Sequence, residues 1–81
     1  MNPSQLITMA NQIGAFFETM PDRAQALADI ATHIKLFWDP RMRQGLLAHI
    51  NHIKTTHNSI ETEHLSDMIM EAVALHRDRI L

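Results

Sequence analysis

The sequence contains no cysteine and no tyrosine, and it has a single valine and only two glycines. Without thiolates the chain cannot form a disulfide, hold an iron–sulfur cluster or build a thiolate zinc site. Because two strong strand formers, valine and tyrosine, are almost missing while alanine, leucine and methionine are abundant, the composition predicts an all-α protein.

Strong charge of one sign and long apolar runs are lacking too. Acidic and basic residues are mixed along the chain and give a net charge of −2, so the basic surface of a nucleic-acid-binding domain is missing. No run of about 18 apolar residues is present to cross a membrane, and residues 1–5 do not resemble the start of a secretory signal. We therefore expect a cytoplasmic protein that binds neither membranes nor nucleic acids.

The length of 81 residues has room for one small domain, which spans residues 1–81. The core of so small a domain rarely contributes more than ~3–5 kcal/mol of net stability. The size of the chain therefore favours additional stabilisation by a partner.

Four segments show the apolar spacing of helices, at about residues 3–19, 23–38, 40–54 and 60–79. Each segment follows a residue that can accept a hydrogen bond from the first turn, and prolines begin the first and third segments. The expected N-caps are Asn2, Asp22, Asp39 and either Asn58 or Ser59. The sequence therefore predicts a small bundle of three to four short helices.

Each predicted helix carries an apolar stripe that we expect to face the core. In the first helix the stripe contains Leu6, Met9, Ala10, Ile13, Phe16, Phe17 and Met20. In the second it contains Ala24, Leu27, Ile30, Ala31, Ile34, Phe37 and Trp38. The third carries Met42, Leu46, Leu47, Ile50 and Ile53, and the fourth carries Leu65, Ile69, Ala72, His76 and Ile80.

The six histidines are the first candidates for chemistry. His49 and His52 are three residues apart, a spacing that can place two imidazoles on one metal, and His57 follows closely. No carboxylate lies in register with them and no HExxH pattern exists, so we favour a solvated helix edge. His76 falls inside an apolar stripe, which favours a partly buried histidine with one hydrogen bond.

Other kinds of site lack their sequence patterns. No serine or threonine lies in a strained strand–turn–helix elbow, and no glycine-rich loop is present to bind phosphates. The corner at Trp38 resembles a helix-turn-helix, but Arg41, Arg43 and Lys54 give too little charge for strong phosphate contact. We expect no catalytic, cofactor-binding or metal-binding residue, and no enzymatic activity of the chain by itself.

A few residues are unusual for an isolated bundle. Gly14 costs about 1 kcal/mol relative to alanine within a helix, so it permits close approach either of another helix of this chain or of a partner. Leu36 faces away from its stripe. Arg41 and Arg43 lie in a first helical turn, where positive charge is unfavourable. Acidic residues of the chain (Glu18, Asp22 or Asp39) or an acidic partner could compensate.

Two segments together resemble the delta subunit of NAD-dependent formate dehydrogenases. The first is MANQIGAFF at residues 9–17 followed by MPDR at 20–23, and the second is HIKLFWDPRMR at 33–43 followed by LLAH at 46–49. The resemblance covers residues 9–50, and beyond them it extends only to a final amphipathic helix. It implies an accessory chain of a cytoplasmic complex in which the alpha subunit oxidises formate at molybdenum or tungsten. Other subunits would carry iron–sulfur clusters, flavin and NAD.

On this resemblance, the chain would bind no cofactor itself and would stabilise or help to assemble the alpha subunit. We expect docking through six residues, with Phe16, Phe17 and Trp38 in the core beneath them. The expected docking residues are Asn11, Gln12, Gly14, Leu36, Arg41 and Arg43. The alternative interpretation is a free-standing helical adaptor or homodimer that uses an exposed apolar stripe.

Overall fold

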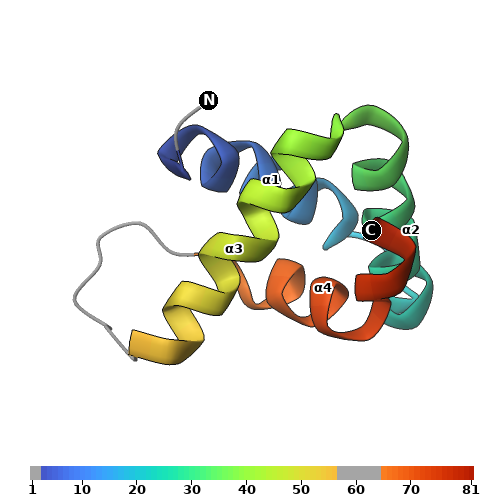
Figure 1. The fold of residues 1–81 in the computed structure, drawn as a ribbon. Helices are drawn as coiled ribbons and strands as arrows, with labels where there is room; N and C mark the ends of the chain where they lie inside the picture. Colours follow the sequence, from blue (N-terminus) through green and yellow to red (C-terminus); the bar gives the residue numbers. More distant parts are fainter. Residues whose placement is uncertain (1–2, 57–64) are drawn as a thin grey trace.

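This computed structural model describes residues 3–56 and 65–81, and these residues contain four helices (Figure 1). They are α1 (Pro3–Phe17), α2 (Arg23–Phe37), α3 (Pro40–Thr56) and α4 (Asp67–Ile80). No strand occurs in these residues. The predicted all-α bundle is therefore confirmed, and the first three helices begin where the sequence predicts.

The most extensive helix pair is α2 with α4, and these two helices run parallel. At the start of the pair, Arg23 of α2 forms an ion pair with Glu71 in the first half of α4. At the other end, Lys35 of α2 donates a hydrogen bond to the carbonyl oxygen of Leu81, directly after α4, at 2.8 Å. The chain connects the two helices through α3, which crosses α1 (Figure 1). The fold is therefore not an up-down bundle.

All four helices contribute to one apolar core, and no polar side chain among the described residues is fully buried. A core of this kind is stabilised mainly by apolar burial, at about 25 cal/mol per Å². The largest fully buried side chains are Ile30, Ile34, Leu46, Ile50, Ile69, Val73 and Ile80. Trp38 is 5% exposed and belongs to this core, as predicted.

Two of the predicted helix caps are observed. The Asp22 carboxylate accepts a hydrogen bond from the Gln25 amide at 3.1 Å, and the Asp39 carboxylate accepts one from the Met42 amide at 2.9 Å. Such caps satisfy N–H groups that have no partner in the first turn of a helix.

The start predicted for the fourth helix, at about residue 60, is wrong. Leu65 and Ser66 are not helical, and α4 begins at Asp67 with Ser66 as its N-cap. The Ser66 amide donates instead to the side-chain oxygen of Asn11 on α1, at 2.8 Å. This tertiary contact and the cap place the start of the helix after Ser66. The N-caps expected at Asn58 or Ser59 lie outside the described residues.

The buried face of α1 also differs from the prediction. Leu6, Ile7, Ala10 and Gly14 are buried, although the predicted stripe placed Ile7 and Gly14 outside it. Phe16, expected in the core, is 64% exposed. The face is rotated because α4 approaches α1 at Gly14, while α3 approaches it at Leu6. A Cβ on Gly14 would lie 3.1 Å from the side chain of Ile69 on α4.

Two other stripe residues, Ala24 and Phe37, are exposed instead of facing the core. Phe37 is 72% exposed at the end of α2, whose buried residues are Ala26, Leu27, Ile30, Ala31 and Ile34. His76 is partly buried, as predicted, but its backbone is non-helical (φ −122°, ψ 29°) and its side chain forms no hydrogen bond with the described residues.

Candidate interaction surface

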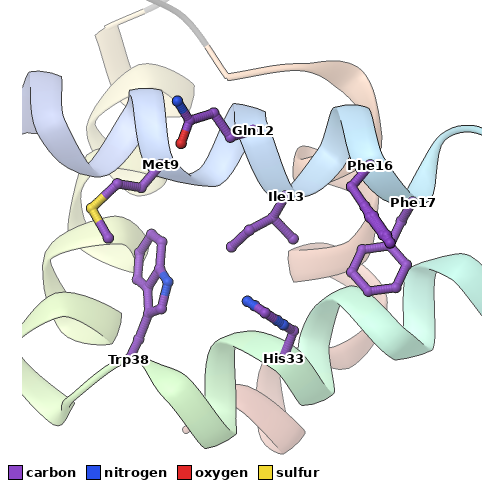
Figure 2. Close-up of a pocket in the computed structure, with 7 residues that line it drawn as sticks. All are labelled: Met9, Gln12, Ile13, Phe16, Phe17, His33 and Trp38. Atoms are coloured by element: carbon purple, nitrogen blue, oxygen red, sulfur yellow. The ribbon is translucent and has the colours of Figure 1, made fainter.

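A groove of about 430 Å³ lies between α1 and α2 (Figure 2). Figure 2 shows Met9 and Trp38 at one end, Phe16 and Phe17 at the other, and Ile13 facing His33 between them. The groove is lined by Met9, Gln12, Ile13, Phe16, Phe17, His33 and Trp38. Its lining is mainly apolar, with polar groups only on Gln12, His33 and the indole of Trp38.

Four aromatic rings form a row that passes from α1 across to α2. Phe16 stacks on Phe17 with centroids 5.1 Å apart, Phe17 meets His33 edge-on at 6.2 Å, and His33 lies 4.7 Å from Phe37. Leu36, next to Phe37, is 70% exposed. Contiguous exposed apolar groups of this kind mark interaction surfaces in soluble proteins.

The groove contains no aspartate, glutamate, lysine or arginine. The whole of α1 is uncharged, and the first charged residue of the sequence is Glu18, directly after that helix. Depletion of charge is typical of the central, fully buried part of a protein interface. The groove is therefore composed like the central part of a protein interface, although it is open to solvent in this structure.

Three of the expected docking residues lie on or near this groove. Gln12 lines it, and Leu36 is exposed beside Phe37 at the end of α2. Arg41 lies in the first turn of α3, three residues after Trp38. It is exposed, and its side chain makes no hydrogen bond or ion pair within the described part of the chain. Whether these residues contact a partner stays a prediction.

Arg43 already has a partner within the chain. Its guanidinium donates a hydrogen bond to the backbone carbonyl of Lys35 at 2.9 Å, in the last turn of α2. Cations are favourable at this end of a helix, where carbonyls lack partners. The charge of Arg43 is thus balanced by a helix end rather than by Glu18, Asp22 or Asp39, and its docking role stays untested.

Asn11 and Gly14 face α4 and not the groove. The Asn11 side chain accepts the Ser66 amide hydrogen bond, and a Cβ on Gly14 would lie 3.1 Å from both the Ser66 hydroxyl oxygen and Ile69 Cγ1. Gly14 therefore permits the close approach of α1 and α4, which is one of its two predicted uses. No observation tests a contact of either residue with a partner.

The histidines form no recognisable metal site in the described ranges. No group of three or more histidine, aspartate and glutamate side chains there could hold a metal ion. The Nε2 atom of His49 is buried without a hydrogen-bond partner, and the side chains of His52 and His57 lie outside the described residues. Among the helices that the structure describes, none is long and apolar enough to cross a membrane.

Sequence reasoning did not identify the groove. It assigned Met9, Ile13, Phe16 and Phe37 to core-facing stripes, because a periodic pattern does not show how wide the buried face of a helix is. The available signal was an excess of apolar residues on α1, where Ile7 and Phe16 lie too far around the helix to face one core.

Comparison with known proteins gives one family. The model of the family described as NADH-dependent formate dehydrogenase delta subunit FdsD matches residues 5–73. The match includes every residue that lines the groove and extends into the first half of α4. Neither the comparison with curated proteins nor that with solved structures gives a significant match.

Proposed function

Since the chain belongs to the family of NADH-dependent formate dehydrogenase delta subunits, we propose that it is a non-catalytic accessory subunit of that enzyme. In this proposal it stabilises the catalytic alpha subunit, or helps to assemble it, in a cytoplasmic molybdenum or tungsten complex. The chain itself binds no cofactor. Formate oxidation and electron transfer to NAD take place on the other subunits.

The uncharged groove between α1 and α2 is the observation that carries this proposal. Phe16 and Phe37 expose most of their surface beside it, although the same chain buries a complete apolar core. Full burial of one such side chain contributes roughly 1.5–3 kcal/mol. A partner that covers both partly exposed rings therefore gains roughly 2–4 kcal/mol of apolar burial, which is one contribution to a subunit contact.

The small size of the domain supports the same role. The core of a domain of about 80 residues gives only a small free energy of unfolding. A partner that binds only the folded chain increases this free energy. The chain stabilises the large subunit in the same way, because it removes from water the part of that subunit's surface that it covers. Mutual stabilisation of this kind is the expected action of an accessory subunit.

The proposal is tested by co-purification. The chain is tagged in its native host, isolated at moderate salt, and its partners are quantified by mass spectrometry. We expect the alpha subunit in near-equal amount. Recovery of the chain alone, under conditions in which the enzyme is active in the extract, would contradict the proposal.

A deletion strain tests the accessory role separately. We expect loss of the chain to lower the amount of assembled enzyme or its metal content. Activity per metal-loaded alpha subunit should stay unchanged, because the chain does not take part in the chemistry. A fall in that ratio would assign the chain a part in catalysis.

The same exposed face also favours a second candidate, a homodimer, because the protruding Phe16 of one copy could enter the groove of another. Sedimentation of the isolated chain over a wide concentration range tests it. A mass that doubles at micromolar concentration supports the homodimer, and a constant monomer mass excludes it.

A further inference from the structure

The groove has the length of two helical turns. Met9 and Phe16, at its two ends, are seven residues apart on α1, which corresponds to about 10 Å at a rise of 1.5 Å per residue (Figure 2). A helix that lies in a groove of this length presents apolar residues at positions i, i+3 or i+4, and i+7. The apolar lining can receive three such side chains.

Opposite charges lie near the two ends of the groove. Glu18 directly follows Phe17, at the C-terminus of α1, where no basic residue occupies the last turn. Arg41 lies three residues after Trp38, in the first turn of α3, which contains no acidic residue. Anions are unfavourable at a helix C-terminus and cations at a helix N-terminus, so each charge has the sign that its own helix end disfavours.

The other charges near these two ends are already used within the chain. Asp22 and Asp39 cap α2 and α3, and Arg43 binds the Lys35 carbonyl. Neither the Glu18 nor the Arg41 side chain forms a hydrogen bond or an ion pair within residues 4–51 and 65–81. The free charges thus leave one end of an uncharged groove positive and the other negative.

We propose that this groove binds an amphipathic helix of another formate dehydrogenase subunit, with acidic residues near Trp38 and Arg41 and basic residues near Phe17 and Glu18. The inference rests on the proposed function and specifies its contact. A helix of this composition complements both free charges of the groove. Because acidic residues favour the N-terminus of a helix and basic residues its C-terminus, the bound helix runs in the same direction as α1.

Site-specific cross-linking within the co-expressed complex tests the location. A photoreactive phenylalanine analogue replaces Phe16 in one variant and Leu75 in the other. Leu75 is the matched control, because it lies on α4 and is likewise 64% exposed. We expect only the probe at position 16 to label a segment of another subunit. That segment should carry apolar residues at i, i+3 or i+4, and i+7 between an acidic and a basic end.

Charge reversal tests the polarity. Arg41→Glu and Glu18→Lys should each weaken the complex about 3- to 10-fold at low salt, with a smaller effect at high salt, because exposed charges are screened. Arg77→Glu, on the exposed side of α4, is the control and should change affinity less than 2-fold. Reversal of the cross-linked partner's opposing charge should restore binding to Arg41→Glu.

The outcomes separate this inference from the proposed function. If the wild-type chain co-purifies with the enzyme but Phe16 cross-links to nothing, or to a segment without these charges, the groove assignment falls and the accessory role stands. A cross-link between two copies of the chain would overturn the assignment in favour of a homodimer. Failure of the wild-type chain to co-purify would overturn both.

Discussion

The two glycines of the chain should respond in opposite ways to alanine, although both lie inside helices at helix crossings. Alanine is favoured over glycine by about 1 kcal/mol in a helix interior. At Gly45 an added Cβ would lie 2.8 Å from Cδ1 of Leu6, the terminal methyl group of a flexible side chain that must shift to make room. We therefore expect Gly45→Ala to be neutral or to stabilise the chain by up to about 1 kcal/mol.

At Gly14 the distances are longer but the neighbours are fixed. The added Cβ would lie 3.1 Å from both Ser66 Oγ and Ile69 Cγ1. Ile69 is fully buried. Ser66 is held by two hydrogen bonds, because its hydroxyl accepts one from the Ile69 amide and its own amide donates one to Asn11. Inserting a methyl group into such packing costs about 1–3 kcal/mol. The gain of about 1 kcal/mol in helix propensity offsets part of this cost. Gly14→Ala should therefore lower the free energy of unfolding by about 0–2 kcal/mol.

Urea and thermal unfolding, followed by circular dichroism, measure the difference. In a domain of this size 1 kcal/mol corresponds to a shift of about 4–8 °C in Tm. Gly45→Ala should therefore have a Tm several degrees higher than that of Gly14→Ala. If Gly14→Ala stabilised the chain as much as Gly45→Ala, α4 would be able to move away from α1 without cost, and the expected difference between the two glycines would be refuted.

Three further substitutions test other contacts of the fold. Trp38→Ala should lower the free energy of unfolding by about 3–5 kcal/mol, since it empties a buried site at the end of the groove; a loss below 1 kcal/mol in urea unfolding would show that this site is not packed. Asn11→Ala should cost about 1–3 kcal/mol and accelerate hydrogen exchange at the Ser66 amide, which loses its acceptor, and unchanged exchange would refute that hydrogen bond. Arg23→Ala should cost less than about 1 kcal/mol, because its ion pair with Glu71 is about half exposed; a double-mutant cycle with Glu71→Ala that gives a larger coupling would contradict this estimate.

Local signals predicted the first three helices well. Asp22 and Asp39 act on amides three residues away, so a cap and its helix start can be found in a short window of sequence. The start of α4 depends on the contact of Ser66 with Asn11, which lies 55 residues earlier. Ser66 also caps an amide three residues away, but Asn58 and Ser59 are local cap candidates as well, and no short window contains the contact with Asn11 that distinguishes Ser66 from them.

The docking role of the candidate residues stays a prediction, and the orientation of their side chains depends on tertiary structure. Asn11 and Gly14 were predicted to contact a partner from their positions in the sequence, but in the folded chain both residues face α4. Phe16 and Phe37 were predicted to lie in the core because they are apolar, but neither belongs to the core, and both are mostly exposed. Only the packing of four helices decides which apolar residues remain outside, and these residues define the groove.

The contact of α4 with α1 has a consequence for regulation of the groove. Helix α4 contacts both walls, through Asn11 and Gly14 on α1 and through the parallel packing along α2. The position of α4 is therefore coupled to the separation of the two walls, which also contact each other directly. If a partner in the groove binds better when α4 is docked, linkage requires that this partner also stabilises α4 to the same extent. The Ser66 amide, remote from the groove, would then exchange its hydrogen more slowly in the assembled enzyme than in the free subunit.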